Sequence, residues 1–157
     1  MRRTHGVSVR STNRFDSDRN TSTWQVTRND NDKALSVAAR FPSYGSKATV
    51  TAVTASGTRI SLKRGSRPIA LHKIAYLWLR SAGNETGYVV VPLSFPAGAG
   101  TAVVRPGQQS SAPDPGPTLV LELISQDRKF DSCTLKVAIG VADSSATAAS
   151  VARKLGA

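Results

Sequence analysis

The stretch that decides the fold class is residues 132–141, SCTLKVAIGV. Every second residue in it is apolar, and the apolar set is Cys133, Leu135, Val137, Ile139 and Val141. Alternation with a period of two is typical of a β-strand with one buried face. Cys133, the single cysteine, falls on the apolar side, so we expect a buried structural thiol rather than a disulfide or a catalytic nucleophile.

Strand patterns extend from this stretch toward the N-terminus. Residues 71–80 are apolar on both faces for most of their length, which predicts a central strand covered on both sides. Residues 88–95 predict a strand that is interrupted at Pro92 by a bulge or an edge, because proline cannot donate to a ladder. Further strands are expected at 23–27, 34–41, 48–54, 58–63, 101–104 and 118–124, with a hairpin turn at 55–57.

The C-terminus has a different character. Asp143-Ser144-Ser145 offers an N-cap and residues 146–155 are alanine-rich, with Arg153 and Lys154 near the end. This pattern favours a short helix whose charges suit its dipole, and a frayed tail is the alternative.

Together these patterns predict an all-β protein, an antiparallel sandwich of eight or nine strands, with the jelly roll as the expected topology. Residues 23–157 form the expected domain. Residues 1–22 are rich in Arg, Ser, Thr and Asn and contain few large apolar side chains, so we expect a basic, flexible arm. The proline- and glycine-rich segment 96–117 is expected to be mostly a long exposed loop.

Positive charge dominates the chain. The 157 residues include 21 Lys and Arg against 10 Asp and Glu, which gives a formal net charge of +11. No acidic residue lies between Asp32 and Glu85. Such an excess indicates a polyanionic partner, and arginine is well suited to phosphate because its planar fork binds two oxygens at once. The alternative is a solvated basic surface.

The candidate RNA-binding residues are basic side chains of the arm and of one strand with its following turn. They are Arg2, Arg3, Arg10, Arg14, Arg19, Arg59, Lys63, Arg64 and Arg67. Contacts from such residues to the phosphate backbone are largely independent of base sequence. Aromatic residues are only 6% of the chain, so base stacking is a weaker expectation than charge neutralisation.

The sequence contains no recognisable catalytic motif. The sequence contains no P-loop, no nucleophile elbow, no zinc-protease helix and no dinucleotide fingerprint, and it has only two histidines. We therefore expect no enzyme activity, catalytic residue, metal, cofactor or small-molecule substrate. No apolar run is long enough for a membrane helix, so no membrane partner is expected.

Two segments resemble parts of a known family. Residues 71–83 (LHKIAYLWLRSAG) are similar to the tryptophan-containing core strand and turn of the jelly-roll coat proteins of small icosahedral RNA viruses, the bromovirus and satellite-virus types. Residues 136–145 (KVAIGVADSS) resemble the strand-to-helix junction of bromovirus coats. The resemblance implies a self-assembling capsid shell of many copies that packages RNA, located in the virion and, during assembly, in the host cytoplasm.

Other function classes remain open. One is a non-assembling RNA-binding β-barrel module, and another is an RNA-phage type of coat protein built from a sheet plus helices. A third is an interaction or structural domain whose charge serves solubility or an acidic protein partner.

Overall fold

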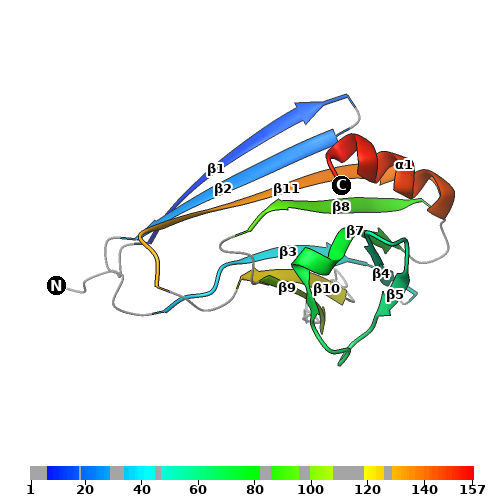
Figure 1. Ribbon diagram of the computed structural model, residues 1–157, viewed down its shortest axis with the longest axis horizontal. Coiled ribbons are helices and arrows are strands. Elements are labelled where there is room, and N and C mark those ends of the chain that lie inside the picture. Colours follow the sequence, from blue (N-terminus) through cyan, green and yellow to red (C-terminus); the bar gives the residue numbers. More distant parts are fainter. Residues whose placement is uncertain are drawn as a thin grey trace, which may run out of the picture.

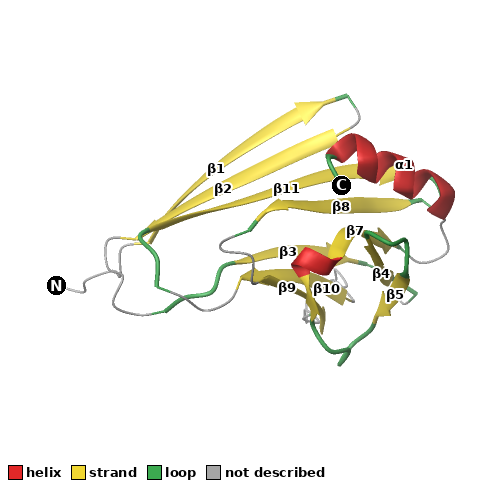
Figure 2. Ribbon diagram, viewed as in Figure 1, coloured by secondary structure: helices red, strands yellow, loops and turns green. Residues whose placement is uncertain are grey.

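Two antiparallel sheets and a C-terminal helix form the computed structural model of this protein (Figures 1 and 2). The structure describes residues 7–17, 19–28, 34–44, 47–81, 86–95, 100–107, 119–125 and 129–157. The strands are β1 (Val7–Asp16), β2 (Arg19–Arg28), β3 (Ala38–Ser43), β4 (Thr49–Thr54), β5 (Arg59–Leu62), β6 (Ile69–Ala70), β7 (Ile74–Arg80), β8 (Gly87–Ser94), β9 (Gly100–Pro106), β10 (Leu119–Ser125) and β11 (Ser132–Ala142). The helices are η1 (Leu71–Lys73), a single 3-10 turn, and α1 (Ser145–Leu155).

The larger sheet has seven strands in the order β1-β2-β11-β8-β7-β4-β5, and the smaller has four in the order β3-β10-β9-β6. The two sheets pack face to face around a core to which both contribute, with Leu77 and Val90 from the larger sheet and Leu121 and Leu123 from the smaller. This face of the larger sheet is called the inner face below. Burial of such aliphatic side chains is the main favourable term in folding.

Helix α1 covers part of the outer face of the larger sheet. It contacts β7, β8 and β11, and Ala148, Ala152 and Leu155 pack against a second core that includes Val89 and Ala138 (Figure 1). Ser144 caps the helix, since its hydroxyl accepts a hydrogen bond from the Thr147 backbone N–H at 3.3 Å. The predicted helix and its capping site are confirmed.

Strand β7 is buried on both faces, as residues 71–80 predicted. Leu77 and Leu79 lie in the inner core, whereas Tyr76 and Trp78 lie in the outer core. The hairpin at 55–57 is also present, with Gly57 at a φ of 83°, a value that glycine adopts without strain.

The predicted irregularity at Pro92 is confirmed as a bulge. Lys136 pairs with Ser94 but the next residue, Val137, pairs with Pro92, so Leu93 is left as the extra residue. Ile60 on β5 is paired with Ala52 on the inner face, yet 37% of its surface stays exposed because β5 is an edge strand.

The structure confirms a mostly β, antiparallel protein with a C-terminal helix, whereas a jelly-roll topology is not confirmed by its strand order. The expected boundary at residue 22 falls inside β2, and residues 7–16 pair with 19–28 along their whole length. The mobility of this segment in isolation stays a prediction. Most of the 96–117 segment lies outside the described residues; within it, β9 contains the strand predicted at 101–104. In the parts that the structure describes, no helix is long and apolar enough to cross a membrane.

Candidate functional site

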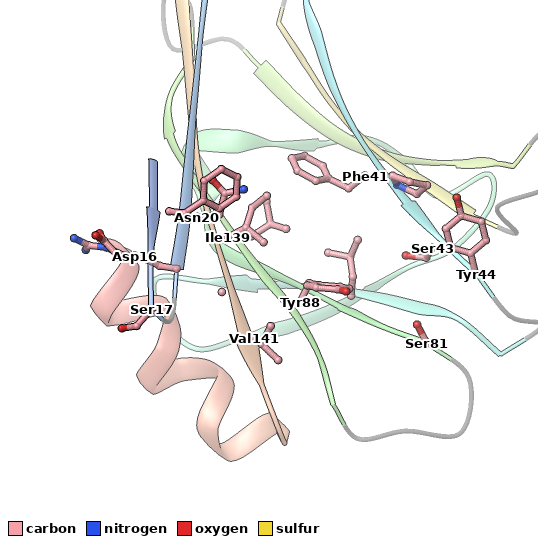
Figure 3. A pocket seen from close by; sticks show the side chains of 16 residues that line it. Asp16, Ser17, Asn20, Phe41, Ser43, Tyr44, Ser81, Tyr88, Ile139 and Val141 are labelled. Carbon is pink, nitrogen blue, oxygen red and sulfur yellow. The ribbon is translucent and has the colours of Figure 1, made fainter. Parts of the chain in front are cut away.

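A cavity of about 760 Å³ opens between the two sheets, beside the β1–β2 hairpin (Figure 3). We call it the intersheet cavity. It exists because the smaller sheet, with four strands, does not cover the inner face of the larger one out to β1. Its lining comes from β1, β2, β3, β7, β8 and β11 and the residues next to them. Small-molecule sites have volumes of about 300–1,000 Å³, so this cavity has the size of a ligand site.

Aromatic side chains form much of this lining. Tyr88 lies near the middle, with Ile139 and Val141 on one side of it and Phe41 and Tyr44 on the other (Figure 3). Tyr88 and Tyr44 are 57% and 54% exposed, which is unusual for large rings in a concave site. Tyr88 faces the cavity because β8 alternates, so that Val89 and Val91 point to the outer core while Tyr88 and Val90 point inward. The cavity therefore presents ring surface that a bound molecule would cover.

Phe15 on β1 adds another aromatic ring to the lining of the cavity. It lies near the end of β1 and is 73% exposed, and its pairing partner on β2 is Asn20. Phe15, Asn20 and Ile139 occupy one row across β1, β2 and β11, all on the inner face. This row brings an aromatic ring, an amide and an aliphatic side chain to one wall of the cavity.

The lining also contains polar groups that can form hydrogen bonds. The Oδ1 atom of Asn20 is buried and has no hydrogen-bond partner within the described structure. An unpaired buried acceptor costs about 1–3 kcal/mol, so native proteins rarely keep one without a reason. Ser43 on β3 and Ser81 after β7 add two hydroxyl groups to the lining.

Charge at the cavity is confined to its rim. The carboxylate of Asp16 accepts a hydrogen bond from Arg19 Nε at 3.0 Å, and Arg14 Nε lies 3.9 Å from the same oxygen. Asp16 points away from Tyr88 and the cavity centre, since it alternates with Phe15 along β1 (Figure 3). The centre of the described lining is therefore uncharged.

A second carboxylate that the sequence analysis passed over lies elsewhere. Glu122 on β10 is buried and forms ion pairs with Arg40 at 2.9 Å and Arg105 at 3.0 Å, one to each carboxylate oxygen. These pairs join the three neighbouring strands β3, β10 and β9. Both carboxylate oxygens of Glu122 are paired with arginines, so Glu122 has a structural role in the smaller sheet.

The predicted RNA-binding residues do not gather into one patch. Arg10 and Arg14 are on β1 and Arg19 begins β2, at one edge of the larger sheet. Arg59 is on β5 at the opposite edge, and Lys63, Arg64 and Arg67 lie in the turn that follows it. Arg2 and Arg3 lie outside the described residues.

Titratable and metal-binding groups are sparse. His72, in η1, is exposed and is not part of the intersheet lining. Within the described ranges, no three His, Cys, Asp or Glu side chains gather as possible metal ligands. Cys133 is buried, as its place in the alternating pattern predicted.

The sequence analysis missed the cavity residues except Arg19, which it predicted to bind RNA. They come from six strands that are distant in the sequence, and no local pattern joins them. The available signal was weak: Tyr88 takes an inward position of an alternating strand, and Phe15 is the one aromatic residue in an otherwise polar segment.

Comparison with known proteins gives one informative match. No family model and no curated protein matches the sequence. Among solved structures, a protein from Escherichia coli K12 that is provisionally assigned as an aldose 1-epimerase superposes with a TM-score of 0.51 at 11% identity. The match covers 88% of this chain and 61% of that protein, so this chain spans about three fifths of its length. The Slr1438 protein from Synechocystis sp. PCC 6803 matches with a TM-score of 0.49 at 9% identity, over 88% of this chain and 56% of that one.

The first match shows a shared fold, and it corrects the predicted identity. The prediction of a viral coat protein is wrong, and with it the predictions of RNA packaging, a capsid shell and a virion location, because the shared fold is that of a bacterial protein assigned to sugar chemistry. The two segments that carried the resemblance are the central strand β7 and the junction of β11 with α1. An apolar central strand and a strand-to-helix junction occur in many antiparallel proteins, so they did not discriminate between folds.

The prediction that the protein has neither an enzyme activity nor a small-molecule substrate is also corrected. It depended on the lack of a familiar motif, whereas the fold is shared with a protein provisionally assigned as an aldose 1-epimerase. Motifs tied to local sequence cannot reveal a site that is assembled from distant strands.

Proposed function

We propose that this protein binds a neutral sugar of the aldose class in the intersheet cavity. The observation that carries the proposal is the combination of exposed rings with an unpaired buried amide oxygen: Tyr88, Tyr44 and Phe15 surround a cavity in which Asn20 Oδ1 has no partner among the described residues. In this proposal the seven- and four-stranded sheets form a β-sandwich that holds the ligand between its layers.

Sugar chemistry matches this lining in two ways. A pyranose ring has C–H faces that pack on aromatic rings and a rim of hydroxyl groups that both donate and accept hydrogen bonds. Asn20, Ser43 and Ser81 supply both kinds of partner, and the tyrosine hydroxyl groups add more. Aromatic side chains that keep one polar atom suit a ligand with one apolar and one polar surface.

The charge pattern favours a neutral ligand over an ionic one. Asp16 is the only carboxylate in the described lining, and Arg19 pairs with it at the rim. Burying an unpaired charge in such a site would be costly, whereas hydroxyl groups can be satisfied by the serine and amide groups present. The fold shared with a protein assigned as an aldose 1-epimerase supports the same ligand class.

Sugar titration tests this proposal directly. D-galactose and D-glucose are added to the full chain, and binding is measured by isothermal titration calorimetry and saturation-transfer NMR. We expect Tyr88→Ala to weaken binding about tenfold because ring contact is lost. We expect Asn20→Ala to weaken it about fivefold because one hydrogen bond is lost.

A matched pair of variants on β1 provides the control. Phe15 lines the cavity whereas Val9, on the same face of the same strand and 60% exposed, does not. Phe15→Ala should weaken sugar binding and Val9→Ala should leave it unchanged. Sugar affinity that is indifferent to Tyr88→Ala, Asn20→Ala and Phe15→Ala would place the ligand elsewhere and overturn the proposal.

A further inference from the structure

A small cavity of about 180 Å³ lies on the outer face of the larger sheet, where β4, β5 and β7 meet the start of α1. We call it the arginine cavity; its polar lining is Thr51, Arg59, Tyr76, Trp78, Arg80 and Ser145. We propose that it binds one tetrahedral oxyanion of the phosphate type. The site is independent of the intersheet cavity, which opens on the inner face.

The two arginines supply the charge. Arg59 on β5 and Arg80 on β7 line the same cavity from opposite sides of β4, and neither forms an ion pair with a described carboxylate. By contrast, Arg40 and Arg105 are both paired with Glu122. Two guanidinium groups at one cavity repel each other, and an anion between them removes that repulsion and accepts hydrogen bonds from both forks.

The position of Arg80 is set by Trp78. The Arg80 guanidinium carbon lies 4.9 Å from the centre of the indole ring, at stacking distance. The ring itself occupies space left by Gly87 on the neighbouring strand, since a Cβ there would lie 2.8 Å from Trp78 Nε1. Gly87, Trp78 and Arg80 thus form a fixed support, and a prepositioned arginine loses less entropy when it binds.

Trp78, which lines the cavity, also contains an unpaired donor, on the edge of its ring next to Gly87. Trp78 is 7% exposed, and its Nε1–H is buried with no hydrogen-bond partner in the described structure. An indole nitrogen can only donate, so the missing partner must be an acceptor. A phosphate oxygen is such an acceptor.

The beginning of α1 adds a further attraction. Ser145 is the first residue of the helix, so its backbone N–H is among those without a partner inside the helix. The first turn of α1 contains no acidic residue, and Asp143, which precedes the cap, is not part of the cavity lining. The positive end of the helix dipole is therefore available to an anion.

The donor set and the size narrow the ligand class. Arg59, Arg80 and Trp78 contribute donors only, while Thr51, Tyr76 and Ser145 contribute hydroxyl groups that can donate. The volume corresponds to roughly six water molecules at about 30 Å³ each, which accommodates a single group of five heavy atoms. Inorganic phosphate and the phosphate head of a small monoester share this chemistry.

Titration with inorganic phosphate at low ionic strength tests the site, with sodium chloride of equal ionic strength as the reference. Calorimetry reports affinity, and tryptophan fluorescence reports contact with Trp78. Arg59→Gln and Arg80→Gln should each weaken binding about tenfold or more, because each removes a charge-assisted hydrogen bond. Trp78→Phe keeps the ring and removes the N–H, so we expect a smaller loss of about fivefold.

Arg10→Gln is the matched control, since it removes the same charge from an exposed position on β1, at the opposite edge of the sheet. It should change phosphate affinity less than about twofold. An equal loss of phosphate affinity in Arg10→Gln and Arg59→Gln would mean that the overall positive charge of the protein attracts phosphate, and it would overturn the proposal. A response to phosphate no larger than that to chloride would do the same.

Two further arms complete the test. Circular dichroism checks that each variant is folded, and Arg59→Gln, which changes an exposed edge-strand residue, keeps the test valid if Arg80→Gln unfolds. Methyl phosphate, a monoester, should bind with an affinity similar to that of inorganic phosphate if one oxygen faces solvent. If inorganic phosphate binds and methyl phosphate does not, the site is assigned to the free anion. Sugar affinity should be unaffected in all these variants, because the sugar cavity lies on the other face.

Discussion

Strands β7 and β1 belong to the same sheet, yet they are held in place by different forces. Every side chain of β7 is buried or half-buried, and cores cover both of its faces. All ten residues of β1 are exposed, and it is held by an unbroken antiparallel ladder with β2. Side-chain burial therefore stabilises the centre of the sheet, whereas the β1 edge is held by backbone hydrogen bonds and by two side-chain hydrogen bonds to β2, from Ser22 to Asn13 and from Arg19 to Asp16.

The difference has a functional counterpart. The part of the inner face that the smaller sheet leaves uncovered is next to β1 and β2, and there the intersheet cavity opens. The fully covered centre provides the rigid wall, with Leu79 and Val90 in the lining. A binding site at the border between a packed and an open region combines a rigid support with access for a ligand.

The largest expected effect is at the centre of β7. Leu77 is fully buried between the two sheets, so Leu77→Ala removes apolar contacts and leaves a void. We expect a loss of about 2–5 kcal/mol in the free energy of unfolding. Urea denaturation followed by circular dichroism measures it, and a loss below about 1 kcal/mol would contradict the assignment of β7 as the core strand.

The next effect concerns the contact between β7 and β8. Gly87 has no room for a side chain, because a Cβ would collide with the Leu79 carbonyl oxygen and lie 2.8 Å from Trp78 Nε1. Gly87→Ala should cost about 1–3 kcal/mol through overpacking. Ser94→Ala, at the exposed far end of the same strand, is the control and should be nearly neutral.

A smaller effect is expected where α1 begins. Ser144→Ala removes the hydroxyl group that caps the helix. The expected cost is about 0.5–2 kcal/mol. Thermal unfolding measures the cost, and Ser150→Ala on the exposed part of the helix serves as the reference. Equal melting temperatures for the two variants would show that the cap is dispensable.

The smallest effect is expected on β1. Val9 is 60% exposed, so Val9→Thr should change stability by less than about 0.5 kcal/mol. Amide hydrogen exchange should distinguish the two strands further, with β1 exchanging much faster than β7 because its ladder opens without unfolding the core. Equal protection of both strands would remove the contrast between them.

Local patterns predicted much of the fold. The alternation of 132–141 predicted β11, the doubly apolar segment 71–80 predicted β7, and Ser144 predicted the start of α1. Pro92 predicted the bulge in β8 because a missing N–H interrupts any ladder. These features depend on neighbouring residues only, and for that reason the sequence shows them.

The site was not predictable in this way. Asn20, Tyr44 and Tyr88 line one cavity only because the sheet order places β11 between β2 and β8 and because β3 belongs to the sheet that packs on the inner face. Segment 1–22 was expected to be a flexible arm because it has few large apolar side chains, and its described part pairs as β1 and the beginning of β2. Its pairing depends on a partner strand, β11, that follows more than a hundred residues later.

The sequence by itself determined which segments become strands, where the helix begins and that the chain is strongly basic, because periodicity, capping and charge are local or summed properties. Tertiary structure alone decided which strands lie side by side, which face stays open, and that the described candidate RNA-binding residues are divided between opposite edges of the larger sheet. The physical reason is that pairing between distant strands is selected by the packing of the whole core, and no short stretch of residues contains that information.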